Sequence, residues 1–93
     1  MLVLSRKKGQ SLWFNGKEMM IEGIKEGGRH DGKLKVNFTG ENDPTRHLTE
    51  EVKEVIPGLC IGFVKGKGKQ YRLLIEAGDM RVARTYEYVR MSA

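Results

Sequence analysis

The chain has 93 residues, of which 17 are Lys or Arg and 12 are Asp or Glu, so its net charge is +5 at pH 7. A chain this short forms one domain, residues 1–93, with a modest core that favours oligomerisation, and its single cysteine, Cys60, excludes an internal disulfide. It has neither a signal-peptide pattern nor a run of about eighteen apolar residues, so we expect a soluble, cytoplasmic protein whose basic charge suits a polyanionic partner.

Short apolar and β-branched runs separated by Gly-rich turns predict a mainly β protein. Asn15-Gly16 is a hairpin signal, and the glycines near Asp31 predict a looser reversal, so neighbouring strands should be antiparallel. Strands are expected near Leu2–Arg6, Glu18–Lys25, Lys33–Thr39, Cys60–Lys65, Gln70–Glu76 and Met80–Tyr86.

One short helix is expected after the third of these strands. Thr49 can cap it, two glutamates fall in its first turn, and Pro57-Gly58 ends it. Apolar residues then fall on one face at spacings of four, three and four, which predicts a packing helix. These residues are Leu48, Val52, Val55 and Leu59.

The second half of the chain carries a basic cluster without a neighbouring acid. Residues 65–72 include Lys65, Lys67, Lys69 and Arg72, whereas residues 41–54 hold five acids. The Gly-Lys repeat lacks the length and the Ser or Thr of a phosphate-binding loop, so it is interpreted as a hairpin tip. That tip either solubilises a turn or contacts nucleic-acid phosphates.

The first twelve residues, Met-Leu-Val-Leu-Ser-Arg-Lys-Lys-Gly-Gln-Ser-Leu, carry a specific pattern. They closely resemble the start of the CsrA/RsmA family of carbon storage regulators, whose pattern is Met-Leu-aliphatic-Leu-Thr/Ser-Arg-Arg/Lys-x-Gly-Glu/Gln-Ser/Thr-Leu. The resemblance implies a small antiparallel-sheet, barrel-like fold in an interlocked homodimer. It also implies binding to GGA-containing loops of mRNA leaders and repression of translation. The matching first-strand residues are Leu4, Ser5, Arg6 and Lys7.

Two registers extend this resemblance, because the family usually ends about thirty residues earlier. In the first, Val82-Ala83-Arg84 matches the family's last-strand Val-His-Arg, and residues 29–69 are an insertion. In the second, residues 33–38 match the third strand, residues 48–52 match the last strand and place Thr49 at the Arg position, and the extra residues are a tail. A partial duplication over residues 58–93 would reconcile both.

The first register adds Val82, Ala83 and Arg84 to the expected RNA site. Arginine can stack on bases and contact guanine in a bidentate manner, although Arg6 and Arg84 could equally be exposed charges or ion-pair partners of Glu76 or Asp79. If Arg84 shares an open edge with Arg6, RNA binding is favoured. A buried ion pair would instead favour a protein-interaction or assembly module that docks through Glu50–Glu54 or the extra segment.

An enzyme is not expected. His30 and His47 are seventeen residues apart in polar loops, and Cys60 has no nearby acid–base partner. No metal-ligand spacing is present. We therefore expect no catalytic residues, metal or cofactor, and no small-molecule or membrane ligand; the expected partners are single-stranded RNA or mRNA hairpin loops and a second copy of the chain.

Overall fold

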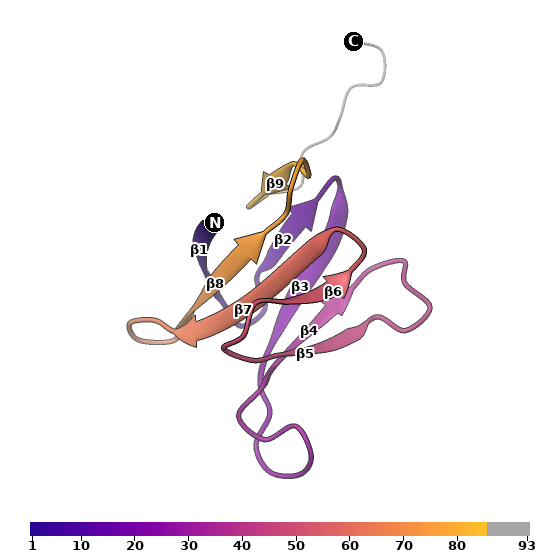
Figure 1. The fold of residues 1–93 in the computed structure, drawn as a ribbon. Helices are drawn as coiled ribbons and strands as arrows, with labels where there is room; N and C mark the ends of the chain where they lie inside the picture. Colours follow the sequence, from indigo (N-terminus) through magenta and orange to yellow (C-terminus); the bar gives the residue numbers. More distant parts are fainter. Residues whose placement is uncertain (86–93) are drawn as a thin grey trace.

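The computed structural model describes residues 1–85, which form nine strands in two antiparallel sheets (Figure 1). The predicted mainly β class is therefore confirmed. One sheet has the order β1-β8-β7-β6, and the other has the order β5-β4-β3-β2-β9. The strands are β1 (Leu2–Lys7), β2 (Ser11–Phe14), β3 (Lys17–Ile24), β4 (Leu34–Phe38), β5 (Thr45–Leu48), β6 (Lys53–Ile56), β7 (Leu59–Lys65), β8 (Gln70–Glu76) and β9 (Val82–Ala83).

Alternating apolar residues of both sheets form one continuous core. In β4, for example, Leu34, Val36 and Phe38 are buried while the residues between them are half-buried, as the two-residue period of a strand requires. The second half of the chain supplies apolar side chains of its own to this core. They include the buried Leu59, Ile61, Phe63, Leu73 and Ile75.

The predicted Asn15-Gly16 hairpin joins β2 to β3. Phe14 and Lys17 are paired directly across it, and both central residues have positive φ, 50° at Asn15 and 83° at Gly16. This is the backbone of a tight hairpin turn, which Asn and Gly adopt at low cost. The predicted looser reversal is also present, because β3 and β4 pair antiparallel on either side of it.

The predicted helix after Leu48 is wrong, and residues 1–85 contain no helix. The segment instead crosses closely over β7 and then becomes β6. The N–H of Phe63 donates to the Thr49 carbonyl at 2.8 Å, and a Cβ on Gly62 would lie 2.7 Å from the Glu51 carbonyl oxygen. Tertiary strand pairing therefore overrides the local helix signals. The predicted cap Thr49 forms a turn in which its Oγ1 accepts the N–H of Glu51 at 3.2 Å.

The first and last strands of the described chain each join the sheet formed by the other half of the chain. Strands β2-β3-β4-β5 form a four-stranded meander, and strands β6-β7-β8 form a three-stranded meander. The first strand, β1, pairs with the last strand of the second meander, and β9 pairs with the first strand of the first meander. Residues 29–69 supply β4 to β7 and therefore contribute to both sheets. No helix in residues 1–85 is long and apolar enough to cross a membrane.

Candidate nucleic-acid interface

All seven residues predicted for RNA binding lie within the described chain, and strand exchange brings their two groups together. β1 is an edge strand of the four-stranded sheet and β9 is an edge strand of the five-stranded sheet (Figure 1). The Nη1 of Arg6 lies 3.4 Å from the carbonyl oxygen of Arg84. We call this surface the β1–β9 edge; it comprises Leu4, Ser5, Arg6, Lys7, Val82, Ala83 and Arg84.

Arg6 lies where the core ends. Leu4 pairs with Leu73 and packs against the core, and Arg6, two residues on, pairs with Tyr71 on the same face of the strand. The guanidinium donates from Nη1 to the Ser11 carbonyl at 3.2 Å and from Nε to its neighbour's carbonyl at 3.1 Å. These contacts hold the half-buried Arg6 side chain beside the edge.

The β2–β3 hairpin fixes the start of β9. The Oδ1 of Asn15 accepts the N–H of Arg81 at 2.7 Å, and the N–H of Asn15 donates to the Arg81 carbonyl at 2.8 Å. β9 then pairs with β2, where Val82 lies opposite Phe14. Val82 and Ala83 are half-buried, and Arg84 is exposed directly after the strand. The hairpin therefore determines where Arg84 reaches solvent.

The electrostatics of the edge favour an anionic ligand. Burial, and next the nearby charge of Arg84, lower the pKa of Arg6 below its usual value. Among the ion pairs of residues 1–85, none includes Arg6 or Arg84, and Glu76 lies 3.7 Å from the N-terminal amine instead. The Arg6 guanidinium thus lies beside the main chain of Arg84 and is influenced by its charge, and neither arginine has a carboxylate partner within residues 1–85. A bound anion would stabilise both positive charges.

The outer side of β1 offers main-chain groups as well as side chains. The N–H of Lys7 donates to Oε1 of Gln10 at 2.8 Å and so points away from β8. Main-chain direction alternates along an antiparallel strand, which places the N–H of Ser5 on the same outer side. No strand within residues 1–85 covers this side of β1. The N–H of Ser5 is therefore positioned to donate to a ligand.

An open cleft continues the edge toward the turn between β7 and β8. Ser5 pairs with Arg72 across the strands and therefore shares a face with it. The cleft has a volume of about 530 Å³, and its lining contains three cations and no acid. It places the basic cluster found in the sequence next to the expected RNA site. Its lining residues are Ser5, Lys65, Gly66, Lys67, Gln70 and Arg72.

The structure also brings together two histidines that the sequence placed in separate loops. The rings of His30 and His47 are stacked, with centroids 3.7 Å apart and planes at 4°. His47 lies in β5 rather than in a loop, opposite Lys35 of β4. Sequence reasoning missed this contact because β5 was not predicted. Within residues 1–85, no group of three His, Cys, Asp or Glu residues could hold a metal ion.

Comparison of the chain with known protein families, with curated proteins and with solved structures finds no match. The chemistry of the β1–β9 edge therefore has to be inferred from its own residues. Those residues supply two arginines that form no ion pair within residues 1–85, an open strand edge and an adjoining basic cleft.

Proposed function

We propose that the protein is a CsrA-like, RNA-binding post-transcriptional regulator, which binds GGA-containing loops of mRNA leaders and represses translation. The observation that carries the proposal is the proximity of Arg6 and Arg84, 78 residues apart in sequence, at an edge where neither forms an ion pair within residues 1–85. The resemblance of the first twelve residues to that family points to the same strand.

The edge offers the groups that single-stranded RNA recognition needs. Bases splayed from a loop can hydrogen-bond to main-chain groups along β1, and a guanidinium can stack on a base or donate two hydrogen bonds to the O6 and N7 of guanine. Lys7 and the cations of the adjoining cleft would neutralise phosphates. Occupation of a leader loop beside the ribosome-binding site would then block translation.

The half-buried, unpaired Cys60 fits a reducing compartment, and we place the protein in the cytoplasm. We also propose a homodimer, as the resemblance implies. Because one chain already supplies both strands of the β1–β9 edge, a homodimer would carry two RNA sites and a monomer would carry one. The solution mass of the protein, measured with and without saturating RNA, gives the oligomeric state and the number of sites.

The first test replaces each arginine in turn. Arg6→Ala and Arg84→Ala should each weaken binding of a GGA hairpin by about 1–3 kcal/mol, the usual loss for a guanine contact. Lys53→Ala removes an exposed cation from β6, at the opposite edge of the β1-containing sheet, and should change affinity little. Fluorescence anisotropy with a GGA hairpin and a scrambled-loop hairpin measures both affinity and preference.

The alternative is a protein-interaction or assembly module on a CsrA-like fold that has lost RNA binding. It is favoured by the exposed Glu50 and Glu51, which line an open hollow of about 620 Å³ together with Phe63. Equal, small losses for Arg6→Ala, Arg84→Ala and Lys53→Ala would reduce RNA binding to diffuse electrostatics and support this alternative.

A further inference from the structure

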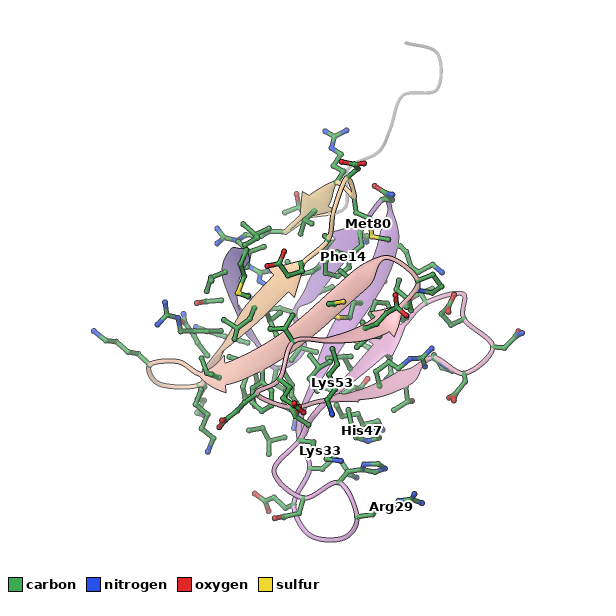
Figure 2. The ribbon with its side chains drawn as sticks, viewed as in Figure 1. Phe14, Arg29, Lys33, His47, Lys53 and Met80 are labelled. Carbon is green, nitrogen blue, oxygen red and sulfur yellow. The ribbon has the colours of Figure 1, made fainter. Side chains whose placement is uncertain are left out.

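A second cationic surface surrounds the stacked histidines at the far edge of the five-stranded sheet. His47 projects from β5 on the same face as Lys35 of β4, and His30 reaches it from the loop between β3 and β4. Figure 2 shows Arg29, Lys33 and His47 gathered at the end of the molecule where this loop lies. We call this surface the β4–β5 basic face; it comprises Lys25, Arg29, His30, Lys33, Lys35 and His47.

The positive charge of this face is not neutralised by acids within residues 1–85. None of its four Lys and Arg residues takes part in an ion pair there. Of the nearby acids, Asp31 accepts the N–H of Gly27 at 2.5 Å, and Glu22, on the outer face of β3, accepts from Asn37 at 2.6 Å. Glu26 is exposed beside Lys25. Glu50 and Glu51 line a hollow together with Asp31 and Lys33. Five acids therefore lie near six groups that carry or can accept positive charge, and none of these acids forms an ion pair with a Lys or Arg of the face within residues 1–85.

One ring nitrogen of the histidine pair lacks a hydrogen-bond partner within residues 1–85. The Nδ1 of His30 is buried and has no hydrogen-bond partner in residues 1–85. Desolvation lowers the pKa values of both histidines, and the neighbouring cations, Lys33 foremost among them for His30, lower them further. For His47, the charge of His30 is the second cause of the lowered pKa, so protonation of one ring disfavours protonation of the other. A bound anion would oppose the effects of the neighbouring positive charges on both pKa values.

We propose that the β4–β5 basic face is a second phosphate-binding surface, which holds the RNA backbone flanking the loop bound at the β1–β9 edge and binds it more tightly as the pH falls. This proposal rests on the proposed RNA-binding function. The two surfaces are distinct, because β5 and β9 are opposite edges of one five-stranded sheet. Four strand spacings separate these edges by about 19 Å, a span that a single-stranded flank of several nucleotides can bridge.

The sign of the pH dependence follows from the histidines. In the free protein their pKa values are lowered, so both rings are mainly neutral at pH 7. A bound phosphate favours the protonated rings and raises those pKa values, so binding takes up protons. Affinity for the flank should therefore rise as the pH falls below about 6.5, the ordinary histidine value.

The first experiment compares a minimal GGA hairpin with the same hairpin carrying a single-stranded extension of about ten nucleotides. The extension should tighten binding by about tenfold at pH 7.5, and by more at pH 5.5 and equal ionic strength. Lys33→Gln/Lys35→Gln should abolish this gain without changing the affinity for the minimal hairpin. The charge-matched control, Lys67→Gln/Lys69→Gln at the turn between β7 and β8, should retain the gain.

The second experiment observes the histidines directly in the unaltered protein. Oligouridylate, which contains no GGA, should shift the imidazole NMR signals of His30 and His47 and raise their pKa values. Unmoved signals, an extension gain that survives Lys33→Gln/Lys35→Gln, or equal shifts with polyglutamate would each overturn the second RNA surface. Wild-type protein that does not distinguish GGA from a scrambled loop would overturn the proposed function instead, and the oligouridylate titration would still report on this face.

Discussion

Arg6 lies partly against the core and partly at the proposed binding surface. Its backbone occupies a core-facing position opposite Tyr71, while its guanidinium donates to the Ser11 carbonyl and lies beside Arg84. The planar guanidinium can make several directed hydrogen bonds at once, which a lysine ammonium cannot reproduce. The pattern of the first twelve residues predicted Arg6 as a site residue. The Ser11 contact was beyond sequence reasoning because it depends on where β2 lies relative to the end of β1.

Gly62 marks a close crossing of two segments. An added Cβ there would lie 2.7 Å from the Glu51 carbonyl oxygen, so Gly62→Ala should force the backbone apart and cost about 1–3 kcal/mol of unfolding free energy. Urea unfolding followed by circular dichroism measures the loss. Gly40→Ala is the comparison variant, because nothing lies within 4 Å of an added Cβ there and its loss would report only the strain of alanine at a φ of +89°. A loss at Gly62 no larger than the loss at Gly40 would contradict a tight crossing.

Strands of five or more residues were predictable from the sequence, and shorter strands were not. The bounds of β3, β4 and β7 differ from the predictions by one residue at most, and each of these strands has buried residues at three alternate positions. The bounds of β1 and β8 were also predicted to within one residue, although β1 buries none of its residues and β8 buries two. By contrast, β5 and β6 each bury one apolar side chain, Leu48 and Ile56, and their strand pattern is too short to recognise. β9 covers two residues of the strand expected over Met80–Tyr86, and Tyr86 lies outside the described residues.

Asn15 allows a test of whether the β2–β3 hairpin positions β9 through its hydrogen bonds to Arg81. Asn15→Gly keeps a residue that tolerates positive φ but removes the Oδ1 that accepts the Arg81 N–H. This hydrogen bond is worth about 1 kcal/mol, so the affinity for a GGA hairpin should fall about fivefold as Arg84 becomes less well positioned. Hydrogen exchange at Val82 and Ala83 should accelerate in parallel. Faster exchange with unchanged affinity would remove β9 from the RNA site.

Positive charge lies at two places around the molecule rather than in one patch. The β1–β9 edge, its adjoining cleft and the turn between β7 and β8 that lines this cleft form one region, and the β4–β5 basic face forms the second. The basic turn was evident in the sequence as a run of lysines. The β4–β5 basic face was not, because its members come from residues 25–47 and meet only through the pairing of β4 with β5.

The turn between β7 and β8 should contribute affinity without sequence preference. Replacing Lys65, Lys67 and Lys69 with Gln should flatten the plot of log affinity against log salt by about 0.7 for each phosphate that is no longer neutralised. The ratio of affinities for GGA and scrambled hairpins should stay unchanged, because guanine recognition is assigned to the arginines of the β1–β9 edge. Titrations at a series of salt concentrations measure both quantities. A reduced GGA preference would show that the turn itself reads sequence.

The exchange of β1 and β9 between the two meanders also affects how the protein is made. During synthesis Arg6 emerges early, but its neighbour at the site is added 78 residues later. β1 cannot pair until β8 has been synthesised, and the outer edge of β2 has no partner strand until β9 has been synthesised. Such distant pairings fold slowly because a long loop must close before any contact forms. A ribosome-bound chain interrupted before β9 would therefore lack the paired arginines, so recognition would begin only after β9 has been synthesised.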